Sequence, residues 1–341
     1  MRQVGCALGL AALVAAGPLG AQTMRTYGAS RPVADAQPPL RTTLEFGAGR
    51  VVVRAGADDA LYDVGLRYDA DRYTPLHRYD PRTGILQLGL KTVGGTGLRV
   101  TSRGQLEQVA RFAFAPTVPI ILQAHLGASE AVLDLGGLTL VELVVRSGVT
   151  RGTVDFSSPT RGDCREALFS VGAAELVAMR LANAGCAEVR VEGGVGRAVL
   201  DFTGSWRRNT RLTAELSMGT LTLRIPRGTG VRVTADRFLT RFDLDDFART
   251  GNTWSTPDFA GATRTLSVAL TTNVAGVEGE WGDRGAVAEG EGRTRKPATR
   301  KTAGFVVFRP SPLALRDVAI RSPAASPPPL RRVRRSDRRS R

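Results

Sequence analysis

The chain has 341 residues, a formal net charge of +15, 42% hydrophobic residues and 6% aromatic residues. This hydrophobic content is high enough to build a core, which excludes a chain that is disordered throughout. The 39 glycines and the low aromatic content are typical of short aliphatic strands joined by tight turns, so the composition favours an all-β fold over long helices.

Residues 1–21 have the organisation of a secretory signal peptide. Arg2 precedes an apolar run over residues 4–16, and a Gly-Pro pair and a small-residue cleavage site ending at Ala21 follow. The run is too short for a membrane span, and no other segment reaches the roughly 18 apolar residues that a transmembrane helix needs. We therefore expect an exported protein, in the periplasm or at the cell surface, with no transmembrane segment in the mature chain.

Residues 22–39, which contain RPVADAQPP, are predicted to form a linker, and the ordered chain is predicted to begin near Leu40. Residues 40–122 are predicted to form an N-terminal β segment that leads into the next region. Alternating apolar residues in RTTLEFGAGRVVVRAG, LYDVGLRYD and GILQLGL are separated there by turn sequences such as DPRTG. Only QLEQVARFAF departs from this pattern, either as one or two helical turns or as a strand interrupted by polar residues.

Residues 123–282 are predicted to form a repeat β-solenoid with a closing cap. The phrases VLDL, TVDF, LVAM, VLDF and LTLR recur with their central residues 21, 23, 23 and 21 residues apart, a period of about 22. Each period holds a second extended stretch, so that a unit can bury its apolar face only by stacking on the next. The central residues are expected to point outward and their apolar neighbours inward. The central residues are Asp134, Asp155, Ala178, Asp201 and Thr222, and the inward pairs are Leu133/Leu135, Val154/Phe156, Val177/Met179, Leu200/Phe202 and Leu221/Leu223.

A β-sandwich of evenly spaced strands is the main alternative for this region. The fixed period, with a glycine at each turn, favours the solenoid. A leucine-rich repeat, suggested by LGGLTLVEL, is disfavoured because the following units lack its Asn or Cys position and its helix.

Few residues carry a signal for chemistry. His77 lies in the turn-rich YTPLHRYDP and His125 in a strand, and neither has a Cys, His or carboxylate at metal-ligand spacing. Surface or strand histidines are therefore favoured over ligands. The sequence contains no Gly-x-Ser-x-Gly elbow, Walker loop or His-Glu-x-x-His motif. We accordingly expect no enzymatic activity, no catalytic residue, no cofactor and no metal site.

Asp134 and Asp155 are expected to lie on adjacent rungs, about 5 Å apart, where two carboxylates repel each other unless a cation, an arginine or water separates them. A Ca²⁺ site needs six or more oxygens, but the next rung offers Ala178 in place of a third acid. Solvated or arginine-paired carboxylates are therefore favoured over a metal site, with Arg151 and Arg197 as the nearby partners.

Cys164 and Cys186 are the only cysteines that follow the signal peptide, and 22 residues, or one repeat, separate them. Stacked rungs lie roughly 4.8 Å apart, within the range of Cα separations that a disulfide accepts. The predicted export compartment permits disulfides, so the spacing favours a bridge. Two buried free thiols are the alternative.

Residues 283–341 are predicted to be a disordered basic tail, because they contain 16 Lys or Arg residues against 5 Asp or Glu residues and are rich in Pro and Ser. Such a tail is either simply solvated or binds an anionic partner such as a membrane surface or an acidic envelope polymer. Its low aromatic content and the predicted export argue against a specific nucleic-acid partner.

The segment VPIILQAHLGASEAVLDLGGLTLVELVVRSGVTRGTVDF resembles the toast-rack and LiaF-like group of bacterial envelope proteins. LEFGAGRVVVRAG resembles the N-terminal segment of that group, and residues 230–281 resemble its closing segment. The resemblance implies a β-solenoid that acts in envelope-stress sensing or surface adhesion, with no catalytic residues to carry over. Members of the LiaF type have membrane helices before the solenoid, whereas this chain begins with a predicted cleavable signal.

Two functional hypotheses follow. The first is a non-catalytic envelope protein that binds an envelope protein or a surface polymer through one side of the solenoid. The second is an adhesin-like module for surface glycans. A solenoid hydrolase of the polysaccharide-lyase type would require clustered carboxylates and basic residues across three rungs, which the sequence does not contain.

Overall fold

The computed structural model describes residues 23–93, 107–236, 241–243 and 246–282. The predicted signal peptide (1–21) and the predicted basic tail (283–341) lie outside the described residues. The all-β prediction is confirmed, because nearly every regular element is a strand.

The strands run in chain order with one short helix among them. They are β1 (Met24–Pro32), β2 (Leu40–Ala55), β3 (Ala60–Asp69), β4 (Tyr73–Asp80), β5 (Ile85–Thr92), β6 (Val109–Phe114), β7 (Ile120–Asp134), β8 (Leu140–Asp155), β9 (Glu166–Met179), β10 (Glu188–Asp201), β11 (Thr210–Pro226), β12 (Gly230–Asp236), β13 (Arg241–Asp243), β14 (Ala248–Thr250), β15 (Thr253–Ser255) and β16 (Thr265–Gly282); the helix is α1 (Leu181–Ala184). QLEQVARFAF thus contains a strand, β6, as one of its two interpretations predicted.

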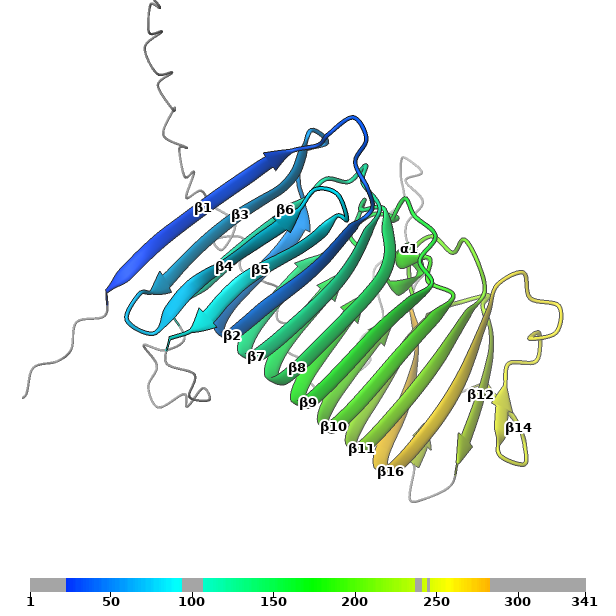
Figure 1. The fold of residues 1–341 in the computed structure, drawn as a ribbon. Coiled ribbons are helices and arrows are strands. Elements are labelled where there is room, and N and C mark those ends of the chain that lie inside the picture. The colour runs from blue at the N-terminus through cyan, green and yellow to red at the C-terminus, as the bar shows by residue number, and fades with distance from the viewer. Residues whose placement is uncertain (1–22, 94–106, 237–240, 244–245, 283–341) are drawn as a thin grey trace, which may run out of the picture. The chain divides into compact units, whose positions relative to one another are not determined.

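Seven long strands stack side by side in parallel, in the order β2, β7, β8, β9, β10, β11 and β16 (Figure 1). Leu122 of β7 aligns with Leu143 of β8, and Leu143 aligns with Ala167 of β9. Because the neighbours are parallel, this parallel stack differs from the antiparallel sheets of the β-sandwich alternative.

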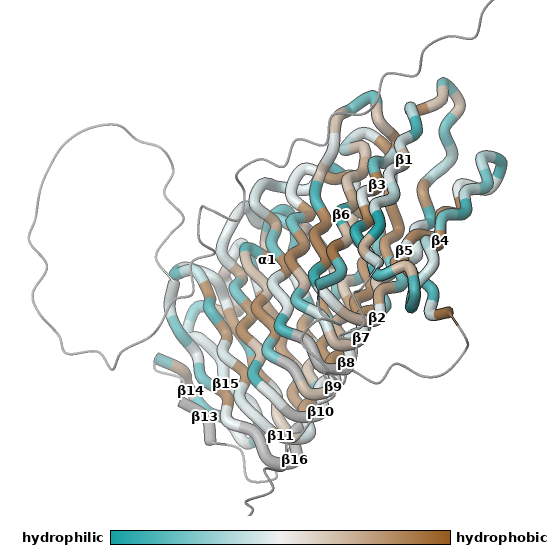
Figure 2. Tube along the Cα trace, turned by 90° about the vertical axis from the view of Figure 1, so that its left-hand side faces the viewer, coloured by the Kyte–Doolittle hydropathy of each residue, from teal (hydrophilic) through white to brown (hydrophobic). Residues whose placement is uncertain are grey.

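Each long strand bends near its middle and contributes to two facing sheets. In β7, the buried residues Leu122, Ala124 and Leu126 alternate up to Gly127, and the alternation resumes in a shifted phase with Ala131 and Leu133. We call the half before the bend the first arm and the half after it the second arm. The inward side chains of both arms form the core, and apolar residues align from strand to strand (Figure 2).

Aligned glycines allow this bend. The residues before and after each of these glycines are paired between neighbouring strands, so the glycines share one register position in successive strands. They are Gly47, Gly127, Gly148, Gly172 and Gly194. The chains approach closely there: a Cβ added to Gly172 would lie 2.8 Å from the carbonyl oxygen of Gly148. A side chain at Gly172 would therefore displace the neighbouring strand.

Additional strands extend both sheets at the N-terminal end of the stack. The first arm of β2 pairs with β5, which pairs with β4; the second arm pairs with β6, which pairs with β3 and then β1. Two predicted boundaries therefore change. Strand β1 lies in the segment predicted to be a linker, and the boundary at residues 122 and 123 falls inside β7, because β2 already belongs to the stack.

The strand registers also show that the central residues predicted for two of the five phrases, LVAM and LTLR, are wrong. Asp155 and Asp201 align with Met179 and Arg224, because β9 and β11 are shifted relative to the predicted central residues. Ala178 and Thr222, which were predicted to point outward, are buried, and Val177 and Met179 are half-buried. The offset from Asp155 to Met179 is 24 residues rather than 23. The connection between β8 and β9 is longer than the connections between β7 and β8, β9 and β10, and β10 and β11. The inward directions of Leu133, Leu135, Val154 and Phe156 agree with the structure.

A disulfide joins Cys164 and Cys186, whose Cα atoms lie 4.2 Å apart. Both residues are buried, and each precedes a strand of the stack, β9 and β10 respectively. The bridge therefore ties together two consecutive connections on the side of the stack opposite to the bends.

Candidate binding surface

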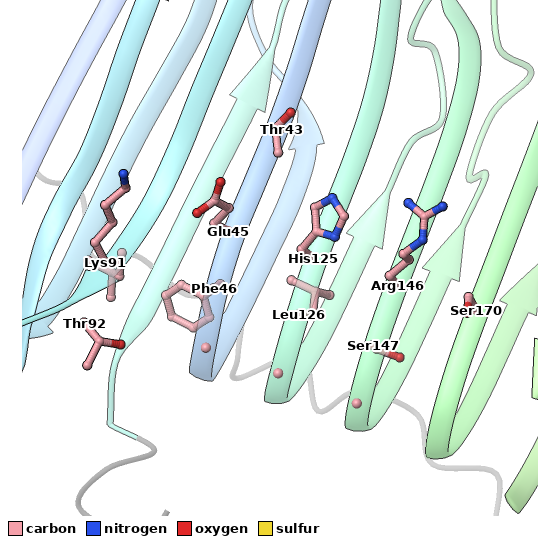
Figure 3. A pocket seen from close by; sticks show the side chains of 14 residues that line it. Thr43, Glu45, Phe46, Lys91, Thr92, His125, Leu126, Arg146, Ser147 and Ser170 are labelled. Atoms are coloured by element: carbon pink, nitrogen blue, oxygen red, sulfur yellow. The ribbon is translucent and has the colours of Figure 1, made fainter. Parts of the chain in front are cut away.

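A shallow hollow of about 900 Å³ lies on the outer side of the first arms, next to the bends. Residues from β2, β5, β7, β8 and β9 line it (Figure 3). Four of its residues occupy one register position in neighbouring strands: Glu45, His125, Arg146 and Ser170. Together with Glu192 and Glu215, which continue the alignment in β10 and β11, we call them the outer row.

The hollow exists because β5 separates from β2. The two strands pair only as far as Glu45 and Gly89, whereas β5 continues alongside β4 to Thr92. Gly89 has a φ of +146°, and a Cβ added there would collide with the carbonyl oxygen of Glu45. Only glycine fits this close approach. Lys91 and Thr92 consequently border the hollow on one side, while β7 and β8 border it on the other.

Most of the side chains that line the hollow are polar, and positive charge predominates among them. Lys91, His125 and Arg146 are exposed, and Glu45 is half-buried between them (Figure 3). Among the described residues, none of these four has a hydrogen-bond or ion-pair partner for its side chain. The aromatic ring in the lining, Phe46, is only 2% exposed and packs into the core. The hollow therefore offers hydrogen-bond donors and charge but no aromatic platform.

Asp134 and Asp155 lie elsewhere, at the ends of second arms, and they align as predicted on adjacent strands. One oxygen of Asp134 accepts hydrogen bonds from the Gly136 N–H, at 3.1 Å, and from the Ser157 hydroxyl, at 2.7 Å. Arg180 pairs with Asp155. Burial raises the pKa of Asp155 above its ordinary value, against the opposing effect of Arg180.

Arg151, one of the two arginines expected near these carboxylates, pairs with a different acid. Arg151 lies 3.4 Å from Glu175 on the neighbouring strand, because the two residues share a register position. Arg180, in the connection after β9, reaches Asp155 instead. In the described part of the chain, no group of three or more His, Cys, Asp or Glu residues could hold a metal ion.

The histidines have different surroundings. His125 is an exposed strand residue, as predicted, but the structure brings it into the hollow with Arg146. His77 lies within β4 rather than in a turn, and its ring is directed between the two sheets. Its Nδ1 and Nε2 lie 2.6 Å from the Tyr27 hydroxyl and 2.9 Å from the Tyr62 hydroxyl.

One protein family is similar to the N-terminal part of the described chain. Residues 32–176 match the family model described as the N-terminal domain of toast_rack, DUF2154. The resemblance to the toast-rack family that the sequence indicated is confirmed over these residues. The toast-rack match begins at the end of β1. It covers β2 to β8 and most of β9, and thus includes residues of all five strands that line the hollow. No curated protein matches the chain.

Several solved structures are similar to this chain at low identity. A proposed cell adhesion protein from Clostridium sporogenes ATCC 15579 is 15% identical, with a TM-score of 0.43 over 76% of this chain and 100% of that chain. A proposed adhesin from Bacteroides fragilis NCTC 9343 is 9% identical, with a TM-score of 0.34 over 75% of this chain and 97% of that chain. At TM-scores below 0.5, these likenesses carry no inference about the chain. No helix in the described ranges is long and apolar enough to cross a membrane.

Proposed function

We propose that this toast-rack protein is an exported, non-catalytic module of the cell envelope that binds an extended surface polymer or an envelope protein along the outer side of its first arms. We also infer that the parallel stack is a β-solenoid, in which each long strand and the connection after it form one coil. The proposed place of action is the periplasm or the cell surface, which follows from the predicted signal peptide.

The observation that carries this proposal is the outer row and the hollow beside it. Parallel neighbours hold their outward side chains at a spacing of about 4.8 Å, so a row across six strands spans a length suited to an extended ligand. The hydrogen bonds of the stack hold that spacing, which means that little ordering entropy is lost from the protein when a ligand binds.

The arrangement of the hollow supports binding more than catalysis. A serine nucleophile needs a histidine within hydrogen-bond reach, about 3 Å. Ser170 and His125 lie two strands apart, or roughly 10 Å at the usual strand spacing. Glu45 and His125 lie on adjacent strands, but an acid and a histidine alone do not define a reaction.

Blocking the hollow tests the proposal. The half-buried Ser170→Trp places a large ring in the hollow, and retention of the exported full chain on isolated cell-envelope fractions should fall about tenfold, or about 1.4 kcal/mol. Thr213→Trp, at a half-buried outward position of β11 outside the hollow, is the matched control and should retain binding. Equal retention of both variants and the unaltered chain would contradict binding at this surface.

An adhesin-like role in binding surface glycans is the second candidate. The polar lining of the hollow favours it, because sugar hydroxyls and acid groups require many hydrogen-bond partners. A glycan array probed with the exported chain and with Ser170→Trp distinguishes the two roles: glycan signals that disappear in the variant favour the adhesin, whereas recovery of one envelope protein that is lost with the variant favours the first role.

A further inference from the structure

We propose that the hollow binds the carboxylate groups of an acidic polysaccharide, with Arg146 as the principal anion-binding residue. The inference rests on the proposed function, because it names the class of polymer that the same surface would take. It is independent of the basic tail.

Positive charge predominates in the hollow. Arg146 and Lys91 are charged at neutral pH, His125 lies between Glu45 and Arg146 in the outer row, and Glu45 is the acid in the lining. Eight other arginines of the described chain lie within 4 Å of a carboxylate, whereas Arg146 does not. Its guanidinium is therefore available for two parallel hydrogen bonds to a ligand carboxylate.

The charge of the side chains in the outer row changes from positive to negative beyond the hollow. This change determines where an anion is held. Ser170 is uncharged, and Glu192 and Glu215 follow in the next two strands. Like charges repel an anionic group placed over β10 or β11. An acid group of the ligand is thus favoured over β7 and β8, beside His125 and Arg146.

The lining also disfavours other classes of ligand. Neutral sugars and nucleobases gain much of their affinity by stacking on aromatic rings, but the Phe46 ring is buried and no exposed Phe, Tyr or Trp is among the described residues that line the hollow. A membrane surface is flat and is bound by exposed apolar and basic side chains together, whereas this site is concave. Charge-assisted hydrogen bonds are what the hollow can supply, and an acidic polysaccharide combines carboxylates with hydroxyls on a narrow chain.

Titration calorimetry of the full exported chain with short oligogalacturonates, and with maltodextrins of the same length as uncharged controls, tests the inference. Oligogalacturonates should bind and maltodextrins should not. Arg146→Ala should weaken the affinity about tenfold, as expected when a hydrogen-bonded charge is removed. Arg211→Ala removes the same charge from an exposed site on β11 outside the hollow and should change the affinity less than about twofold.

Glu45→Gln provides a test of opposite sign. Replacing this carboxylate by a neutral amide of similar size removes repulsion toward a bound anion, so the affinity for oligogalacturonates should increase several-fold. The predicted basic tail contributes the same background in every variant, and the differences among variants therefore report the hollow alone. A variant that merely misfolds cannot produce this gain.

Four outcomes overturn the inference. Equal affinities of Arg146→Ala and Arg211→Ala would place binding elsewhere, and equal binding of maltodextrins would show that charge is not recognised. Tighter binding of polyphosphate or of vesicles rich in anionic lipid would assign the site to another ligand class. If oligogalacturonates fail to bind while Ser170→Trp still abolishes retention on envelope fractions, the ligand class is wrong and the proposed function stands.

Discussion

His77 connects the two sheets at the N-terminal end of the stack. It belongs to β4, at the edge of one sheet, and contacts Tyr27 of β1 and Tyr62 of β3 in the other. Both tyrosine rings meet the imidazole edge-on, with ring centroids 5.9 and 5.5 Å away. A neutral imidazole donates one hydrogen bond and accepts another, so two hydroxyl partners satisfy both ring nitrogens.

This position predicts a loss of stability in mild acid. Burial lowers the pKa of His77 below its ordinary value of 6.5, so the unfolded chain takes up the proton more readily than the folded chain. The contribution of neutral His77 is therefore complete above about pH 6.5 and decreases as the pH falls below that value. The melting temperature, measured from about pH 7.5 to about pH 5, should fall less steeply for His77→Gln than for the unaltered chain. His125→Gln, at an exposed histidine, is the control, and an unchanged slope for His77→Gln would contradict the assignment.

The disulfide between Cys164 and Cys186 gives a second prediction at the residue scale. The unreduced chain, unfolded in denaturant, should label no thiol of the exported protein, and reduction should expose two. Replacing both cysteines by alanine should lower the free energy of unfolding by about 3 kcal/mol, because the bridge closes a loop of 22 residues in the unfolded chain. Labelling of both thiols without reduction would contradict the bridge.

The row of glycines at the bends determines how closely the strands stack. A Cβ added to Gly127 would overlap the carbonyl oxygen of Gly47, whereas a Cβ added to Gly148 would lie 3.7 Å from the carbonyl oxygen of Gly127, an ordinary contact. Two glycines at the same register position thus differ in how much space they have. The difference reflects small changes of the bend from strand to strand, which no sequence pattern indicates.

Gly127→Ala and Gly148→Ala form a matched pair for this reason. Gly127→Ala should reduce the free energy of unfolding by about 1–3 kcal/mol, since the backbone of β2 must shift to make room. Gly148→Ala should be neutral or stabilise slightly, because alanine restricts the unfolded chain. Urea denaturation measures both changes, and equal losses would show that the bend tolerates no side chain anywhere.

The arrangement of the strands explains which features of the fold could be predicted from the sequence. Alternation and the period of about 22 residues predicted that neighbouring units stack and that Asp134 and Asp155 lie side by side, because both depend on local pattern. The central residue of LVAM was predicted one residue too early, at Ala178 instead of Met179. A longer connection before β9 changes the number of residues between aligned positions but leaves the strands paired in the same way. The hollow and the contacts of His77 arise from the pairing of β5 and from strands distant in sequence. The segment around His77 was predicted to be rich in turns, but it pairs with β5 along its whole length.

At the scale of the described molecule, the stack continues beyond the toast-rack match. Residues 32–176 end within β9, yet β10, β11 and β16 pair with the same parallel register and the same two arms. The buried residues form one cluster that includes Leu40 in β2 and Val277 in β16. Stacked repeats contact mainly their neighbours, so such an array unfolds as one unit only when each interface is strong enough to couple the next.

The continuous core predicts a single unfolding transition for the whole stack. Phe169 is fully buried in β9, near the middle, and Phe169→Ala should lower the free energy of unfolding by about 3–5 kcal/mol. All three tryptophans, Trp206, Trp254 and Trp281, follow β10 in the chain, so their fluorescence reports the C-terminal part, whereas circular dichroism reports every strand. In urea both signals should shift together to a lower midpoint, because the loss in the middle weakens both sides.

Val132→Ala is the control for this prediction. Its side chain is 38% exposed, so the substitution should change the free energy of unfolding by less than about 0.5 kcal/mol. Separate midpoints for fluorescence and circular dichroism in Phe169→Ala would instead show that the N-terminal and C-terminal parts of the stack unfold independently.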